Sequence, residues 1–176
     1  MLNPFYVVGF VDGEGCFSIT INKKSDKNPE VRLIFEIELR GDDENILKEI
    51  QKVLQCGNIY RLEYERYAKW QPHVKYKVSN FTDISSKIIP FFEKYPLQAK
   101  KQNQFKKFCL AAEIISRKEH LTSEGIERII KIKHKDSLDA LDAHVQWGAM
   151  ETNQSQSPPV KSGKSVAPEA PNRAPR

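Results

Sequence analysis

Cysteine is scarce in this chain of 176 residues, which contains only Cys16, Cys56 and Cys109. An odd number of cysteines at unrelated spacings excludes a readable disulfide framework and a cysteine-based zinc site, and it fits a reducing compartment. Long apolar runs are also missing, because none approaches the roughly 18 residues that a membrane span needs. No basic region precedes an apolar signal segment at the N-terminus. We therefore expect a soluble protein with no membrane partner and no targeting segment.

Apolar periodicity is lacking after about Met150, where the composition changes sharply. Residues 151–176 hold five of the ten prolines, together with many small and polar residues. Such a composition predicts a disordered segment. A native tail, a linker and an expression addition all fit it. We expect one folded domain over residues 1–150 and a Pro/Ser-rich tail over residues 151–176.

The charge of the chain is mildly basic, and its apolar content is sufficient for a core. There are 28 Lys and Arg residues against 23 Asp and Glu residues, which gives a formal net charge of +5. Hydrophobic residues make up 39% of the chain and aromatic residues 10%. A basic excess favours a nucleic-acid partner.

Helical and strand patterns alternate along the chain as far as about residue 135. Asn3 and Pro4 are suited to the cap and first turn of a helix over residues 5–12. A second helix is expected to start at Asp42-Asp43 and to close at Gly57. Strand patterns cover residues 16–24, 31–40, 58–66 and 73–79, and later helical patterns cover residues 82–95, 97–117 and 122–135. The order αββαββα predicts an α+β fold, with an antiparallel sheet and helices on one of its faces.

Alternation along these strands assigns side chains to two faces of the sheet. The inward set is apolar: Phe17, Ile19, Ile21, Leu33, Phe35, Ile37, Leu39, Tyr60, Leu62, Tyr64, Val74, Tyr76 and Val78. The outward set is mostly polar: Ser18, Thr20, Asn22, Lys24, Arg32, Ile34, Glu36, Glu38, Arg40, Arg61, Glu63, Glu65, Lys75, Lys77 and Ser79. Polar side chains of these types read base edges, and a two-stranded ribbon fits the major groove of DNA. A plain solvated face shows the same alternation, so both interpretations stay open here.

Two acids, Asp12 and Glu14, follow a short apolar helix and are separated by Gly13. A solvated helix end explains them, and so does a metal site, since Mg²⁺ prefers carboxylates, carbonyls and water. Gly13 leaves its own carbonyl open to approach. Gly9 and Gly13 are four residues apart, which gives a smooth helix face against which a second helix can pack. Two such helices related by a two-fold axis bring two copies of Glu14 together, as metal-assisted phosphodiester hydrolysis requires.

Three segments carry a family resemblance that covers about residues 4–135. Residues 7–15 read VVGFVDGEG and resemble the LAGLIDADG signature of homing endonucleases, in its variant AGFVDGEG. Residues 95–105, with Tyr95-Pro96-Leu97, Lys100-Lys101-Gln102 and Phe105, resemble the lysine segment of this family. Residues 118–125, with KEHLT followed by Glu124-Gly125, are similar to the HLT-x-EG stretch of organellar members.

The resemblance implies a site-specific double-stranded DNA endonuclease on an αββαββα fold, whose four-stranded sheet forms a DNA-binding saddle. It implies hydrolysis with Mg²⁺ or Mn²⁺ at a long, near-palindromic site, with short 3′ overhangs, and Ca²⁺ as an ion that binds without supporting cleavage. Carried over to this chain, Glu14 is the metal ligand, assisted by the carbonyl of Gly13. Lys101 matches the active-site lysine best, Lys100 is the alternative, and Asp12 is a more structural member of the catalytic set. Leu39 stands where relatives place a solvent-positioning glutamine, so that role is unassigned, with Glu38 and Arg40 as candidates.

The resemblance also implies how this chain assembles and where it acts. A single motif is typical of homodimeric members, so a homodimer is expected, with residues 7–12 dividing between the dimer interface and the core: Val7, Val8, Gly9, Phe10, Val11 and Asp12. The DNA-contacting residues are expected on the outward face, from Ser18 to Arg40 on the first two strands and at Arg61, Glu63, Lys75 and Lys77. Organellar relatives imply a mitochondrial or chloroplast intron-homing protein. The alternative is an intron RNA maturase, a splicing cofactor on the same fold.

Overall fold

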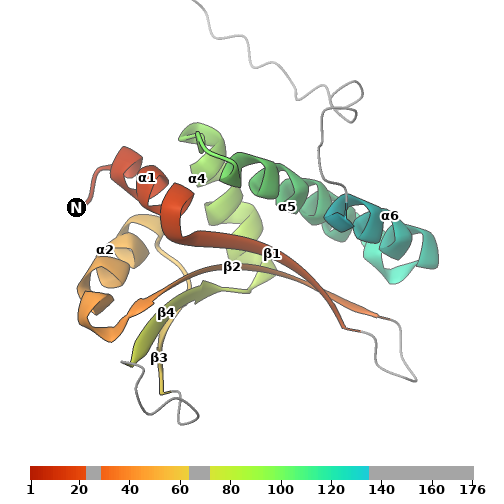
Figure 1. Cartoon of the computed structure of the whole chain (residues 1–176). Helices are drawn as coiled ribbons and strands as arrows, with labels where there is room; N and C mark the ends of the chain where they lie inside the picture. Colours follow the sequence, from red (N-terminus) through yellow and green to blue (C-terminus); the bar gives the residue numbers. More distant parts are fainter. Residues whose placement is uncertain (23–28, 64–71, 135–176) are drawn as a thin grey trace, which may run out of the picture.

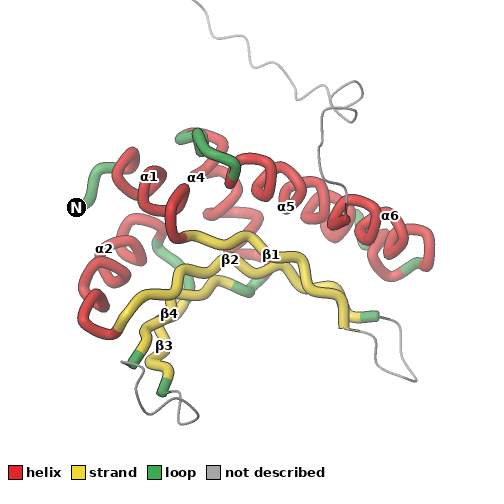
Figure 2. Tube along the Cα trace, viewed as in Figure 1, coloured by secondary structure: helices red, strands yellow, loops and turns green. Residues whose placement is uncertain are grey.

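The computed structural model describes residues 1–22, 29–63 and 72–134, and these form one antiparallel sheet with helices over one of its faces (Figures 1 and 2). The first elements are α1 (Pro4–Glu14), β1 (Gly15–Asn22), β2 (Glu30–Arg40), α2 (Glu44–Leu54), β3 (Asn58–Leu62) and β4 (His73–Val78). They are followed by α3 (Phe81–Asp83), α4 (Ile89–Lys94), α5 (Lys101–Ser116) and α6 (Ser123–His134). The strand order is β1-β2-β4-β3. The predicted α+β class and αββαββα order are therefore confirmed.

Helix α1 starts where the sequence predicts and ends two residues later than expected. The Asn3 side chain accepts a hydrogen bond from the Phe5 N–H at 2.9 Å, and Pro4 occupies the first turn. Such a cap satisfies one of the N–H groups that a helix start leaves unpaired. The helix continues to Glu14, and the chain enters β1 at Gly15 without a loop. The acidic end of α1 is thereby fixed to the edge of the sheet.

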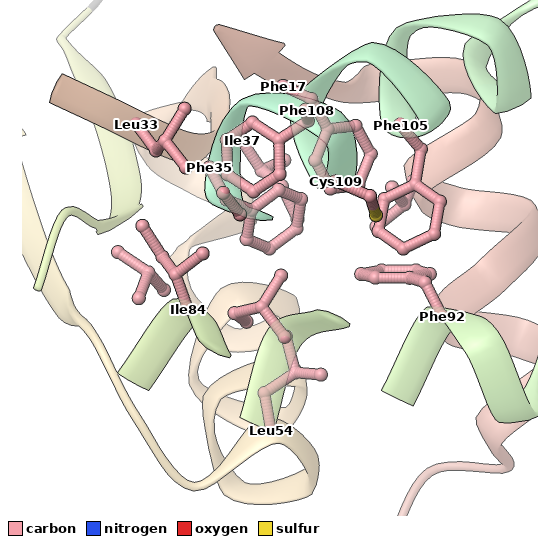
Figure 3. Packing of buried hydrophobic residues seen from close by; sticks show 14 of the residues in the cluster. Phe17, Leu33, Phe35, Ile37, Leu54, Ile84, Phe92, Phe105, Phe108 and Cys109 are labelled. Atoms are coloured by element: carbon pink, nitrogen blue, oxygen red, sulfur yellow. The ribbon is translucent and has the colours of Figure 1, made fainter. Parts of the chain in front are cut away.

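The core lies between the sheet and the helices and is rich in aromatic rings. Phe17 on β1 stacks on Phe35 on β2, with ring centroids 4.9 Å apart. Phe92, Phe105 and Phe108 meet Phe17 edge-on, at centroid distances of 5.2–5.4 Å (Figure 3). Each such buried side chain contributes about 1.5–3 kcal/mol by burial, and edge-on pairs add to this. The core therefore provides a rigid base for the opposite face of the sheet.

Strand β3 is the one strand whose predicted face assignment is wrong. It pairs with β4 so that Ile59 lies opposite Tyr76, Arg61 opposite Val74, and Tyr60 opposite Lys75. Arg61 is therefore on the helix-covered side, whereas Tyr60 and Leu62 are on the uncovered side. The prediction failed because apolar residues occupy both faces of this edge strand, and a shift of one residue exchanges the two faces. Tyr64 and Glu65, which belonged to the same prediction, lie outside the described residues.

Several helix boundaries also differ from the predictions, each for a local reason. Helix α2 ends at Leu54 because Gln55 adopts the left-handed conformation (φ 55°), and Gly57 (φ 74°) serves the next turn instead. The helix predicted over residues 82–95 contains a π-helical turn, η2 (Ile84–Ile88), before α4. Pro90 lacks the N–H that a regular α-helix would need there. The remaining turns are the 3₁₀ segments η1 (Gly41–Asp43) and η3 (Glu119–Leu121).

Helix α5 begins at Lys101, four residues later than predicted, because residues 97–100 form a turn. The C-terminal helix α6 runs from Ser123 to His134, close to the predicted span of 122–135. Within residues 1–22, 29–63 and 72–134, no helix is long and apolar enough to cross a membrane. The tail over residues 151–176 lies outside the described residues.

Candidate active site and nucleic-acid interface

The two acids of the N-terminal motif have different surroundings. The carboxylate of Asp12 accepts hydrogen bonds from the backbone N–H groups of Gln98, at 2.8 Å, and Ala99, at 3.3 Å. These groups belong to the turn that leads into α5. A carboxylate that accepts backbone N–H bonds acts as a cap for the segment that donates them. Asp12 thus fixes the start of α5, and with it Lys100 and Lys101, beside the end of α1.

Glu14 is the last residue of α1, and its side chain is exposed. Within the described parts of the chain, no hydrogen bond or ion pair engages it. An added Cβ at Gly13 would meet nothing within 4 Å, so the backbone beside Glu14 is open to approach. Among the described residues there is no group of three His, Cys, Asp or Glu side chains that could hold a metal ion.

Cys16, two residues after Glu14, shows which charged groups surround the beginning of β1. Burial raises the pKa of the Cys16 thiol, and Glu36 raises it further, whereas Lys101 and Lys75 lower it. Glu36 lies directly opposite Cys16 in the pairing of β1 with β2. Lys101 on α5 and Lys75 on β4 act on the same thiol electrostatically. Lys101 is half-buried, whereas Lys100 is exposed.

One face of the sheet is left uncovered by the helices, and the strands arch beneath them (Figure 1). The strand register brings most of the predicted outward residues together on this uncovered face: Ser18, Thr20 and Asn22 on β1, Arg32, Ile34, Glu36, Glu38 and Arg40 on β2, and Lys75 and Lys77 on β4. Cys16, Glu30, Asn58, Tyr60, Leu62 and His73 share this face and were not predicted as contacts. Lys24 lies outside the described residues.

Arg61 lies on the helix-covered side of the sheet, and Glu63 directly follows the last residue of β3. The guanidinium of Arg61 is 2.9 Å from a carboxylate oxygen of Glu44 on α2, on the side opposite the uncovered face. Arg61 and Glu63 line a cavity of about 430 Å³ at the end of the sheet, together with Gly41, Asp42, Glu44, Pro72 and His73. Leu39 lies opposite Val74 and shares its helix-covered side. Both candidates for solvent positioning, Glu38 and Arg40, lie on the uncovered face.

Oppositely charged side chains alternate across β2 and β4 in the middle of this face. The ammonium group of Lys75 is 2.9 Å from Glu38 Oε2 and 3.6 Å from Glu36 Oε2. The other oxygen of Glu38, Oε1, is 3.2 Å from His73 Nδ1. These contacts hold the side chains in fixed positions, so the centre of the face presents an ordered set of donors and acceptors.

Residues 7–12 were expected to divide between a dimer interface and the core, and their burial differs accordingly. Val7 and Val11 are fully buried, and Val8 is nearly so, in the core of this chain. Tyr6, Gly9 and Gly13 are exposed on the other side of the helix, and Phe10 between them is partly buried against the core. The Tyr6 and Phe10 rings lie 6.1 Å apart in a stacked arrangement, and a Cβ added at Gly9 would meet nothing within 4 Å. The face open to a second helix is thus Tyr6, Gly9, Phe10 and Gly13, and it was only partly predicted.

Comparison with known proteins identifies close relatives. Residues 7–112 match the family model described as LAGLIDADG endonuclease. The chain is 34% identical over 129 residues to "Probable intron-encoded endonuclease 2" of Neurospora crassa, covering 73% of this chain and 26% of that protein. It is 32% identical over 144 residues to "Probable intron-encoded endonuclease 3" of the same organism, covering 80% and 26%. The chain thus spans about a quarter of the length of these relatives.

Solved structures match the fold as well. Meganuclease I-SmaMI bound to uncleaveable DNA with a TTCT central four superposes with a TM-score of 0.69 at 31% identity, covering 77% of this chain and 45% of that chain. The I-LtrWI LAGLIDADG homing endonuclease bound to target DNA gives a TM-score of 0.69 at 31% identity, covering 78% and 45%. Another similar structure is I-SmaMI bound to an uncleaved DNA target in the presence of calcium ions.

Proposed function

The chain belongs to the LAGLIDADG endonuclease family, and from this premise we propose that it is a site-specific endonuclease that hydrolyses both strands of double-stranded DNA. The observation that carries the proposal is the exposed carboxylate of Glu14 at the end of α1, where Asp12 accepts hydrogen bonds from the segment that directly precedes Lys101. The family resemblance adds a long, near-palindromic target and short 3′ overhangs.

A divalent metal, Mg²⁺ or Mn²⁺, fits this site. Glu14 would hold it through its side chain, with the backbone carbonyl of Gly13 as a second oxygen. When bound, such an ion supplies Lewis-acid stabilisation of the attacking and leaving oxygens. The I-SmaMI structure with calcium and uncleaved DNA supports Ca²⁺ as an ion that binds in this chain without supporting cleavage.

The chain's own side chains have separate tasks in this proposal. Lys101 is the positive charge next to the scissile phosphate, where it stabilises the negative charge that develops on the phosphoryl oxygens. Asp12 does not meet the substrate; it holds the turn before α5 and so positions Lys101. Replacing Lys101 with alanine is expected to slow cleavage strongly, whereas the same change at the exposed Lys100 leaves most of it. The reverse pattern would assign the role to Lys100.

A second copy of the fold completes the site in this proposal. The face of α1 formed by Tyr6, Gly9, Phe10 and Gly13 packs against the same face of a second chain in a homodimer, as two-fold symmetry requires. The chain covers 45% of the matched I-SmaMI chain, which leaves room there for a second unit. Sedimentation at micromolar concentration is expected to give a dimer. A monomer that still cuts both strands would contradict the shared site.

The intron-encoded relatives support an origin in an organellar intron. One relative is an uncharacterised protein in ND4 intron 1 of Podospora anserina, 32% identical over 125 residues. The same relatives make an intron RNA maturase the alternative function. This chain keeps Glu14 and Lys101, which splicing without cleavage does not need, and this favours the endonuclease.

The direct test is a selection of cleaved duplexes from a randomised DNA library in the presence of Mg²⁺. The expected result is one enriched, near-palindromic site that is cut on both strands. Recovery of uncut DNA only, with tight and specific binding to intron RNA, would support the maturase instead.

A further inference from the structure

The centre of the uncovered face carries two carboxylates, although phosphate repulsion makes acids unfavourable on a DNA-binding surface. Glu36 and Glu38 are neighbours on that face of β2, and β4 places a lysine opposite each of them: Lys77 opposite Glu36 and Lys75 opposite Glu38. Acids in such positions cost affinity for any DNA. They are useful where they read base edges, because a carboxylate accepts a hydrogen bond from the cytosine amino group.

The Glu38–Lys75 pair offers an acceptor and a donor side by side. Lys75 Nζ is 2.9 Å from Glu38 Oε2, and the two side chains remain 23% and 32% exposed. His73 holds the other oxygen of Glu38 at 3.2 Å, so the carboxylate is oriented before any DNA arrives. A pair held in this way loses little conformational freedom on binding.

A G·C base pair is the complement of this arrangement in the major groove. Guanine presents the acceptors N7 and O6 to a lysine, and the paired cytosine presents its N4 amino group to a carboxylate. An A·T pair presents its groups in another order: adenine N7 and its N6 amino group, then thymine O4 and the methyl group. A carboxylate placed over the cytosine amino position would there face the O4 acceptor of thymine, and the lysine would face the N6 amino donor, so both charged groups lose a partner, which is costly for desolvated charges.

We infer that Glu38 and Lys75 together read one G·C base pair in each half of the target, an inference that rests on the proposed function. The next pair on the same face, Glu36 and Lys77, then lies over a second base pair. Residues i and i+2 of a strand are about 6.7 Å apart, which is close to two base-pair steps of about 3.4 Å. The second contact is therefore expected about two base pairs from the first.

The test is binding of the full chain to a randomised duplex library without divalent metal, followed by sequencing of the bound DNA. The wild type is expected to prefer G·C over A·T at one position of each half-site by about 5- to 150-fold, as one good base contact gives. Glu38→Gln and Lys75→Gln are both expected to lose the preference at that same position and to keep the preferences elsewhere. Lys75→Arg is expected to retain it, because arginine makes the same contact with guanine.

A charge exchange makes the test sharper. In the double variant Glu38→Lys/Lys75→Glu, the donor and acceptor change places, so the preference is expected to invert from G·C to C·G at this position. The matched controls are Glu49→Gln and Lys52→Gln, which remove the same charges from an ion pair on α2 and are expected to leave the sequence profile unchanged. Thermal melting of each variant confirms that it is folded.

Three outcomes would overturn the inference. A profile unchanged in Glu38→Gln and Lys75→Gln would show that the ion pair is only structural. Changes at two different positions, or at an A·T pair, would show that the two side chains do not read one G·C pair. A wild-type chain that selects no duplex sequence would overturn the proposed function itself, and the inference with it.

Discussion

Gly9 offers a prediction in which the stability of the chain and its assembly change in opposite directions. The residue lies in the middle of α1, and a Cβ built on it would meet nothing within 4 Å. Gly9→Ala is therefore expected to stabilise the isolated chain by about 0.5–1 kcal/mol, because glycine is that much less favourable than alanine inside a helix. In the proposed dimer the added methyl groups meet the second α1 helix. Overpacking of about 1–3 kcal/mol then weakens association by about 5- to 150-fold.

Two measurements on the same variant separate these effects. Urea unfolding of the dilute chain is expected to show a midpoint about 0.3–0.5 M higher, at an unchanged slope, for a typical slope of about 2 kcal/mol/M. Sedimentation over a concentration series is expected to show the weaker dimer. Gly15→Ala is the matched comparison, because its Cβ would lie 2.6 Å from Val11 Cγ1 and 2.9 Å from Val11 O, so it should destabilise the chain. If Gly9→Ala lowers the unfolding midpoint of the dilute chain, the position is not open as the structure indicates. If it leaves a measurable dimer as tight as before, this face of α1 is not the interface.

Three further predictions follow from single contacts. Asp12→Ala removes the acceptor for the Gln98 N–H and should lower the free energy of unfolding by about 0.5–2 kcal/mol in urea titration, as the loss of a capping side chain does. An unchanged midpoint would show that water replaces it. Cys16 is the exposed cysteine and lies on the uncovered face, which DNA covers in the proposed function, so bound target DNA should slow its alkylation, measured by mass spectrometry. Equal rates with and without DNA would place the DNA elsewhere. Gly125→Ala puts a Cβ 2.0 Å from the Glu119 carbonyl oxygen and should lower the free energy of unfolding by about 1–3 kcal/mol. An unchanged melting temperature would contradict the packing of η3 on α6.

The core and most of the uncovered face could be predicted from sequence because strands β1, β2 and β4 alternate cleanly. Phe17 and Phe35, for example, lie on the core side of the sheet, while the residues next to them in the chain lie on the uncovered face, because successive side chains of a strand point to opposite faces. The faces of strand β3 could not be predicted in this way, because Ile59 and Tyr60 are adjacent apolar residues on opposite faces. Its register is set by pairing with β4, which the local pattern does not specify.

The candidate site was predictable in its parts but not in their arrangement. The motif itself suggests a carboxylate site, yet the separate surroundings of Asp12 and Glu14 depend on a turn more than 80 residues away. For the open face of α1, the signal in the sequence was used in part. The spacing of Gly9 and Gly13 predicted a face for a second helix, and the same period of 3.6 residues also points to Tyr6 and Phe10. His73 was missed because a single histidine at a strand start has no distinctive pattern.

The central claim is that Glu14 holds the metal that DNA cleavage requires, and one variant tests it most directly. The duplex selected by the wild-type chain is incubated with Glu14→Gln, with Mg²⁺ present, and both binding and cleavage of that duplex are measured. The account predicts that Glu14→Gln binds the duplex within a few-fold of the wild type and cuts neither strand. Cleavage by Glu14→Gln at the wild-type rate would contradict it.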